Sequence, residues 1–116
     1  MVDIDDLERL LINAATEKRT LAYGDVLRHF DKRTTPIRVY ALCRDLGKVS
    51  DRNRERGEPE LAVLVVRKSD RLPGEGFFHG PWEEGHYDGP ATGPRAVAYI
   101  EGLTQSVFDY WDTGPN

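Results

Sequence analysis

The spacing of apolar residues predicts two helices in the first third of the chain. Over residues 3–18, apolar positions recur three or four apart, with acidic residues in the first turn and basic residues at the end. A short extended segment follows at residues 20–22. Residues 23–31 then repeat the helical periodicity. The apolar positions of these two helices are Ile4, Leu7, Leu11, Ala14, Ala15, Val26, Leu27 and Phe30.

A third helix is predicted over residues 36–56, because Thr35 and Pro36 form a strong start signal. The side-chain periodicity continues past Gly47, which favours one helix ended by Gly57 over two shorter ones. Its apolar stripe consists of Val39, Leu42, Leu46 and Val49, and roughly the opposite face carries Ala41, Arg44, Lys48 and Arg52.

The second half of the chain predicts a hairpin, a long connection and a last helix. Residues 61–68 are apolar and rich in β-branched side chains, as in a buried strand. Turn-forming residues fill 69–76, so residues 77–78 are expected to pair back as a short strand. Residues 79–93 are predicted to form a loop or arm, and residues 94–112 a helix. The apolar side of that helix consists of Val97, Ile100, Leu103, Val107 and Trp111, which should pack against the core or against a second copy of the chain.

This order of elements predicts an α+β fold of the winged helix-turn-helix type. Three N-terminal helices precede a β-hairpin wing, and a further helix follows at the C-terminus. The 116 residues are expected to form a single domain, 1–116, with its winged-helix core at residues 3–78. In this architecture the third helix enters a groove of nucleic acid, while the hairpin contacts the flanking backbone.

Charge is distributed unevenly along the chain, and this changes the functional expectation. The net charge is −4, but residues 28–71 hold 12 basic and 7 acidic residues, while the two ends together hold 4 and 13. A polyanion would be attracted to the middle of the chain and repelled by its ends. The longest apolar run, residues 61–66, is far shorter than the ~20 residues of a membrane-spanning helix, so no membrane contact is expected.

The basic residues of the third helix and of the hairpin are the candidate nucleic-acid contacts. On the helix they would reach groove and phosphates, and on the hairpin they would contact backbone. Tyr40 is a candidate for contact with a sugar or base, with packing against the second helix as the alternative. A solvated helix face with i,i+4 ion pairs is the alternative for the basic stripe. The candidate contact residues are Arg38, Tyr40, Arg44, Lys48, Arg52, Arg67, Lys68 and Arg71.

Part of the chain resembles a known family. The run Leu21-Ala-Tyr-Gly-Asp-Val26, followed by a helix containing Val39-Tyr-Ala-Leu42, resembles the DNA-binding C-terminal domain of alkylguanine-DNA alkyltransferases and alkyltransferase-like proteins. The resemblance covers roughly residues 21–78 and implies DNA binding. The family's reactive Pro-Cys-His-Arg motif is missing, since Val65-Val66-Arg67-Lys68 stands in the comparable region. The stretch from Leu64 to Phe78 also resembles small bacterial and phage-associated proteins of unknown function.

The residues that could carry chemistry favour a protein that is not an enzyme. The only thiol, Cys43, is expected to be buried and inert beside the apolar stripe of the third helix. A group of histidines and acids at residues 79–88 matches no metal-ligand spacing, so neither a metal nor a cofactor is expected. No nucleophile with a partnering base can be identified.

The sequence therefore predicts a cytoplasmic bacterial protein that binds duplex DNA without catalysing a reaction, as a regulator or as an accessory factor of a mobile element. RNA as the target remains open. The alternative is a protein-interaction module of the same fold, which would use its acidic, aromatic C-terminal part to bind a basic partner or to form a homodimer. That part contains Glu83, Glu84, Asp88, Glu101, Asp109 and Asp112 beside Trp82, Tyr110 and Trp111.

Overall fold

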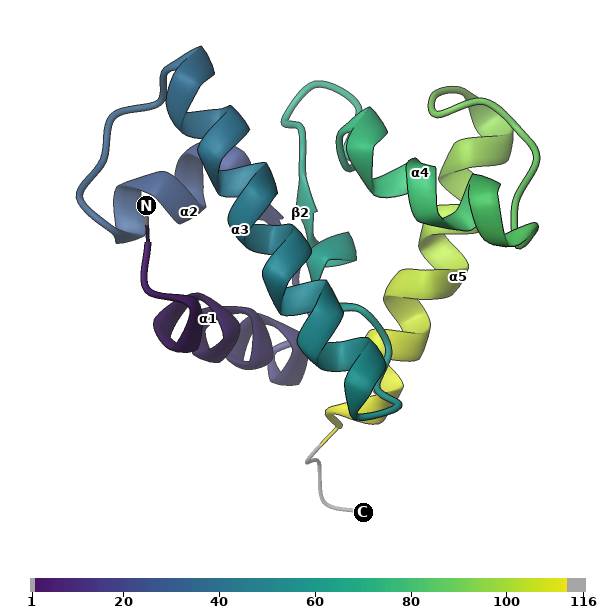
Figure 1. Cartoon of the computed structure of the whole chain (residues 1–116), viewed down its shortest axis with the longest axis horizontal. Coiled ribbons are helices and arrows are strands. Elements are labelled where there is room, and N and C mark those ends of the chain that lie inside the picture. Colours follow the sequence, from purple (N-terminus) through teal and green to yellow (C-terminus); the bar gives the residue numbers. More distant parts are fainter. Residues whose placement is uncertain (1, 113–116) are drawn as a thin grey trace.

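The computed structural model describes residues 2–112, which form helices around a short buried central segment (Figure 1). The winged-helix prediction is wrong, because the described residues are mostly helical and contain no β-hairpin. None of the helices in this part of the chain is long and apolar enough to cross a membrane. In chain order the elements are α1 (Ile4–Thr16), β1 (Leu21–Ala22), α2 (Tyr23–His29), α3 (Pro36–Glu55), the 3₁₀-helix η1 (Leu61–Leu64), β2 (Val65–Val66), α4 (Glu75–Glu84) and α5 (Pro94–Tyr110).

The first three predicted helices are confirmed. Asp3 caps α1, since its side chain accepts a hydrogen bond from the backbone N–H of Asp6. Helix α3 runs without interruption through Gly47, as its periodicity predicts, and ends before Gly57, whose φ of 71° suits glycine. The inward faces of α1 and α3 pack together around residues of zero or near-zero exposure, namely Leu7, Leu11, Ala14, Ala15, Leu42, Leu46 and Val49.

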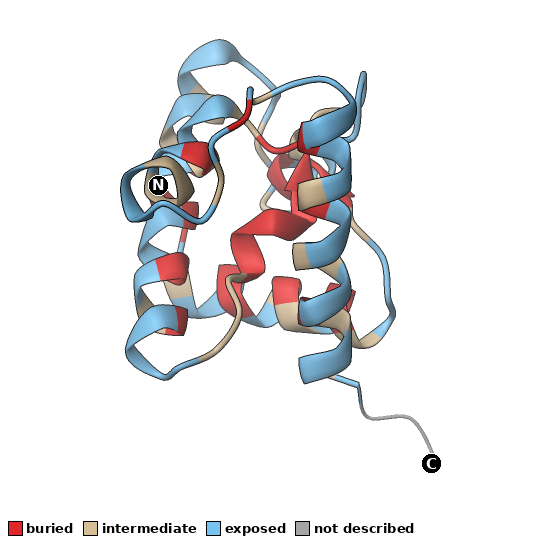
Figure 2. Ribbon diagram, turned by 90° about the vertical axis from the view of Figure 1, so that its right-hand side faces the viewer, coloured by how far each residue is buried: buried red, intermediate tan, exposed pale blue. Residues whose placement is uncertain are grey.

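The predicted strand over residues 61–68 is mostly not a strand. Its first four residues form η1, and only Val65–Val66 are extended, paired in parallel with Leu21–Ala22. All six residues from Leu61 to Val66 are buried, and η1 contacts α1, α3 and α5. The buried residues gather at the centre of the molecule with the helices around them (Figure 2). The apolar run therefore serves as a central core segment, and its burial comes from helices rather than from neighbouring strands.

The turn after β2 exists, but it does not return the chain as a hairpin. Residues 67–72 close on themselves, with the backbone N–H of Arg67 donating to the carbonyl of Leu72 and the Asp70 carboxylate accepting from the N–H of Leu72. The chain then enters α4, so Phe77 and Phe78 are helical and the predicted partner strand is wrong.

Helix α4 also replaces the first part of the loop predicted at residues 79–93. Phe78 and Trp82 lie four residues apart on one face of α4, and Phe78 is fully buried against the rings of Trp82, Tyr87 and Tyr99. Gly85, with φ of 76°, ends the helix. The indole N–H of Trp82 donates to the carbonyl of Gly89 at 2.8 Å and holds the remaining loop against α4. Aromatic packing thus favours a helix where the local sequence indicates an irregular segment.

The C-terminal helix is confirmed as α5, which starts at Pro94 and lies along the side of the molecule behind α4 (Figure 1). Of its predicted apolar side, Ile100 and Val107 are buried and Leu103 and Trp111 half-buried, whereas Val97 is exposed. The helix therefore packs against the core of its own chain.

Candidate nucleic-acid interface

The N-terminal half of α3 exposes two large apolar side chains. Thr35 caps the helix by accepting from the N–H of Arg38 at 3.2 Å, and Pro36 opens its first turn. One turn apart on the outer face, Ile37 is 81% exposed and Tyr40 is 71% exposed. Most of the Tyr40 side chain is therefore accessible to solvent. These values are high for side chains of this size, and they mark a surface that the chain itself leaves uncovered.

The sequence around these two side chains is basic. From residue 32 to residue 44 the chain holds Lys32, Arg33, Arg38 and Arg44 and no acidic residue. The first acid after this stretch, Asp45, is buried at 1% exposure and accepts a hydrogen bond from the backbone N–H of Val2. Residues 32–44 therefore bring positive charge and no negative charge of their own to this part of α3.

Four of the predicted contact residues lie along residues 38–48 of α3. Tyr40, Arg44 and Lys48 are exposed, and Arg38 is half-buried with its guanidinium 3.5 Å from the carbonyl of Arg33. Lys48 lies 3.9 Å from the Asp45 carboxylate but keeps a largely exposed side chain. This group is available to a ligand that approaches α3 from solvent.

Arg52 does not belong to that surface. Its Nη1 donates to Asp5 at 2.6 Å and to Glu8 at 3.1 Å, so it joins α3 to α1. Arg56 donates to the other oxygen of Glu8 at 2.6 Å. The hydrogen bond and charge of Arg52 hold the pKa of the Asp5 carboxyl below its usual value. Arg52 thus has a structural role as an ion-pair partner of α1.

The predicted wing residues occupy a turn rather than a hairpin. Arg67 binds both carboxylate oxygens of Asp70, at 3.1 and 2.9 Å, and lowers the pKa of that carboxyl. The guanidinium of Arg71 donates to the Thr20 hydroxyl, and Lys68 is exposed. Lys68 is therefore the best placed of the three to contact a ligand.

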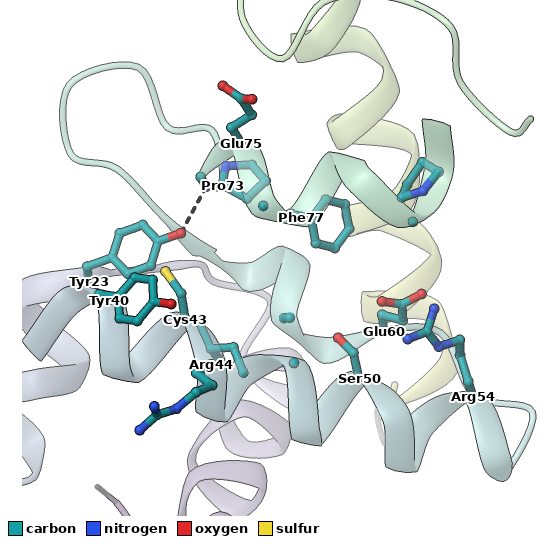
Figure 3. Close-up of a pocket in the computed structure, with 17 residues that line it drawn as sticks. Tyr23, Tyr40, Cys43, Arg44, Ser50, Arg54, Glu60, Pro73, Glu75 and Phe77 are labelled. Atoms are coloured by element: carbon teal, nitrogen blue, oxygen red, sulfur yellow. Dashed lines mark hydrogen bonds between the residues drawn. The ribbon is translucent and has the colours of Figure 1, made fainter. Parts of the chain in front are cut away.

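A groove of about 540 Å³ lies between α3 and α4, next to the exposed face of α3 (Figure 3). Tyr23, Tyr40 and Cys43 form one end, and Ser50, Arg54 and Glu60 form the other. Leu46 and Ala62 contribute to its apolar floor, and the ring of Phe77 points into it from α4. Several glycines complete the lining, namely Gly47, Gly74, Gly76 and Gly80.

The expectation that Cys43 is buried is wrong, because the residue is exposed and lines this groove. Its sulfur lies beside the hydroxyl of Tyr23, which accepts from the N–H of Gly74 at 2.9 Å (Figure 3). Partial burial raises the pKa of the Cys43 thiol, and burial raises the pKa of Tyr23 to about 12. Both groups are protonated at neutral pH, so the thiol is a poor nucleophile.

The histidines and acids of residues 79–88 do not form a metal site. Within residues 2–112, no group of three or more histidine, cysteine or acidic side chains is arranged to hold a metal ion. His86 lies 3.9 Å from Glu84, and Asp88 pairs with Arg95 at 2.8 Å. These side chains form ordinary surface contacts.

Comparisons with protein-family models, with curated proteins and with solved structures found no match. These comparisons neither support nor refute the resemblance of residues 21–78 to alkyltransferases.

Sequence reasoning missed the groove and its glycines. Gly76 and Gly80 are four residues apart in the sequence. This spacing places them on one face only if residues 75–84 form a helix, which the sequence analysis did not predict.

Proposed function

We propose that this protein binds duplex DNA without catalysing a reaction, and that the N-terminal half of α3 makes the contact. One observation carries the proposal: Ile37 and Tyr40 are exposed on a helix face that holds basic residues and no acid. In the free protein, the apolar area of this face stays in contact with water, which is unfavourable. Duplex DNA can neutralise the basic side chains with its phosphates and cover the apolar ones with its bases.

Each residue type on this face has a matching partner on DNA. Arg38, Arg44 and Lys48 pair with phosphates or with base edges, for which arginine is suited by its planar, bidentate fork. Tyr40 offers a ring that packs against sugar or stacks on a base, and Ile37 offers an aliphatic contact of the kind made with a thymine methyl group. Lys68, on the turn after β2, adds a backbone contact. Arg52, Arg67 and Arg71 are left out, since their guanidinium groups already bind within the chain.

The acidic ends of the chain restrict how DNA can approach. Outside residues 28–71 the local net charge is −9, so only the α3 side attracts a duplex. We expect weak non-specific affinity and one docking orientation. A cytoplasmic location is part of the proposal, because a chain with a single cysteine has no intramolecular disulfide to form in an oxidising compartment.

The test is a titration of mixed-sequence duplex, followed by fluorescence anisotropy at two salt concentrations. Arg44→Ala should weaken binding and flatten the slope of log affinity against log salt by about one unit, as expected for one lost phosphate contact. Arg9→Ala is the matched control, because Arg9 is an exposed helical arginine on α1 that pairs only locally with Asp6. Equal effects of the two variants would refute the assignment of α3, and a flat titration at low salt would refute DNA binding.

A second candidate function is protein interaction through the C-terminal face. The observation in its favour is Tyr110, which is 53% exposed and lies against Trp111 between Asp109 and Asp112. Trp82, which the sequence analysis grouped with this face, is engaged elsewhere. Its ring packs on Phe78 and its indole N–H donates to the carbonyl of Gly89. This alternative predicts no salt-dependent duplex binding, and Arg44→Ala would be silent in every DNA assay.

A further inference from the structure

The hydroxyl of Ser50 faces the α3–α4 groove without a hydrogen bond. Ser50 is only 5% exposed, yet within residues 2–112 its side chain has no donor or acceptor partner. A serine inside a helix commonly bonds to the carbonyl one turn back, as Ser106 of α5 does with Gly102 at 3.1 Å. Ser50 instead directs its hydroxyl from α3 into the groove (Figure 3). A hydroxyl in so buried a position is unfavourable without a partner, so this one points to a ligand in the groove.

A carboxylate and a guanidinium lie at the same end of the groove. Glu60 is half-buried, and no hydrogen bond or ion pair within the described part of the chain involves its carboxylate. Arg54 lies next to it and their charges interact, but the Arg54 Nη2 donates to Asp51 at 2.9 Å instead (Figure 3). The guanidinium also reaches α4, since a Cβ added to Gly80 would lie 3.7 Å from its Nη1. Ser50, Arg54 and Glu60 therefore offer hydrogen-bond donors and an acceptor together, where Arg54 closes the groove.

The surfaces beside this polar end are apolar. Leu46 and Ala62, at 5% and 7% exposure, contribute to the floor, and the ring of Phe77 points in from α4 (Figure 3). The volume of about 540 Å³ is in the range that holds a small organic molecule. A flat molecule of two fused rings would cover the floor and pack against Phe77.

The polar end selects the charge and the hydrogen-bonding groups of that molecule. An anion would be repelled by Glu60, and a cation would be repelled by Arg54. A purely apolar molecule would cover the three polar side chains and satisfy none of them. An uncharged amide fits, because its C=O accepts from Ser50 and Arg54 while its N–H donates to Glu60.

We propose that the α3–α4 groove binds an uncharged aromatic amide, a small molecule that carries an N–H and a C=O side by side on a flat apolar body. This goes beyond the proposed DNA binding and does not depend on it. The site uses the end of the groove away from Tyr40 and Arg44, so the two proposals can fail separately (Figure 3).

The first test uses 2-quinolinone, a two-ring lactam, in a ¹H–¹⁵N titration of the labelled protein. Its N-methyl derivative is the control ligand, because it keeps the rings and the C=O but has no N–H to donate. The lactam should bind with a Kd of about 1 mM or tighter, and the largest shifts should fall on the amides of Gly47, Ser50 and Gly80. The N-methyl derivative should bind about tenfold more weakly, since it leaves the Glu60 carboxylate covered and unsatisfied.

The second test changes the protein. Ser50→Ala should weaken lactam binding about fivefold without lowering Tm, because the hydroxyl has no partner within the described chain and alanine favours a helix. Ser106→Ala is the matched control, an exposed helical serine outside the groove, and it should leave the affinity unchanged. Glu60→Leu should give the lactam and its N-methyl derivative equal affinities, since the acceptor for the N–H is gone. Glu83→Leu, which changes an exposed acid of α4 outside the groove lining, should keep the tenfold difference.

The proposal is overturned if 2-quinolinone causes no shifts at about 5 mM, if its largest shifts lie outside the groove, or if wild type binds both ligands equally. It is also overturned if Ser50→Ala, shown to be folded by circular dichroism, binds the lactam as tightly as wild type, or if Glu60→Leu keeps the preference for the lactam. A flat duplex titration beside normal lactam binding counts against the DNA surface alone.

Discussion

Replacing Phe78 by alanine tests the part of the fold that the sequence predicts wrongly. Phe78 is fully buried on α4, and its ring lies 5.7 to 6.5 Å from the rings of Trp82, Tyr87 and Tyr99. Truncation of a buried phenylalanine costs about 3–5 kcal/mol, from lost transfer energy and the cavity that remains. We place this site near the lower end, about 3–4 kcal/mol, because half-buried neighbours such as Trp82 can move into the space. For a domain of this size the change lowers Tm by about 12–16 °C.

The assay is a thermal melt with urea unfolding on the same samples. Phe77→Ala is the comparison, because Phe77 is half-buried at the groove and should cost about 1 kcal/mol. A double-mutant cycle of Phe78 and Trp82 should give a coupling of about 0.5–1.5 kcal/mol, as for aromatic side chains in contact one helical turn apart. A Phe78→Ala cost equal to that of Phe77→Ala, or a coupling of zero, would refute helix α4.

Three further predictions concern α3 and its neighbours. Gly47→Ala should stabilise the protein by up to about 1 kcal/mol in urea unfolding, because it removes a helix-interior glycine and its methyl group meets no described atom; destabilisation would show that the helix is bent there. Arg52→Ala should leave duplex affinity unchanged but remove a pH-dependent contribution to stability. The folded pKa of Asp5 lies below its ordinary 3.8, so this contribution is present above about pH 4 and is lost as the pH falls through the lowered value. In thermal melts from pH 2 to about pH 5, the Tm of the variant should therefore change less with pH than that of the wild type. An equal pH dependence would contradict the ion pair. Iodoacetamide should alkylate Cys43 with an apparent pKa above the ordinary 9.0 of a thiol; transfer of an alkyl group from alkylated guanine to this residue would contradict the non-enzymatic proposal.

Helices α1, α2, α3 and α5 were predictable because each has a periodic apolar stripe. Helix α3 passes through Gly47 since apolar residues continue on both sides, and α5 begins at Pro94 as expected. Residues 61–78 were not predictable from local pattern. Six consecutive buried residues fit a central strand or a central 3₁₀ segment equally well, and only the surrounding helices decide between them. Phe78 lies on a helix because the rings of Trp82, Tyr87 and Tyr99 pack on it there, and two of these rings come from outside α4.

The site was predictable only in part, and the reason is geometric. Residues four apart on a helix advance about 40° around its axis, so Arg52 lies about 80° from Arg44 although both belong to one i,i+4 series. That rotation turns Arg52 toward Asp5 and Glu8 of α1, which no reading of α3 alone can show. Cys43 is exposed because it faces the groove between α3 and α4, which the periodicity of α3 alone does not show.

The most direct measurement for the proposed function is a two-dimensional ¹H–¹⁵N spectrum of the labelled protein during titration with duplex DNA. It reports each amide separately and therefore locates the contact. The account predicts that the largest shifts fall on residues 36–48, with Ile37, Tyr40 and Arg44 among them, and that α5 is unaffected. Largest shifts on residues 94–110, or no shifts at low salt, would contradict it.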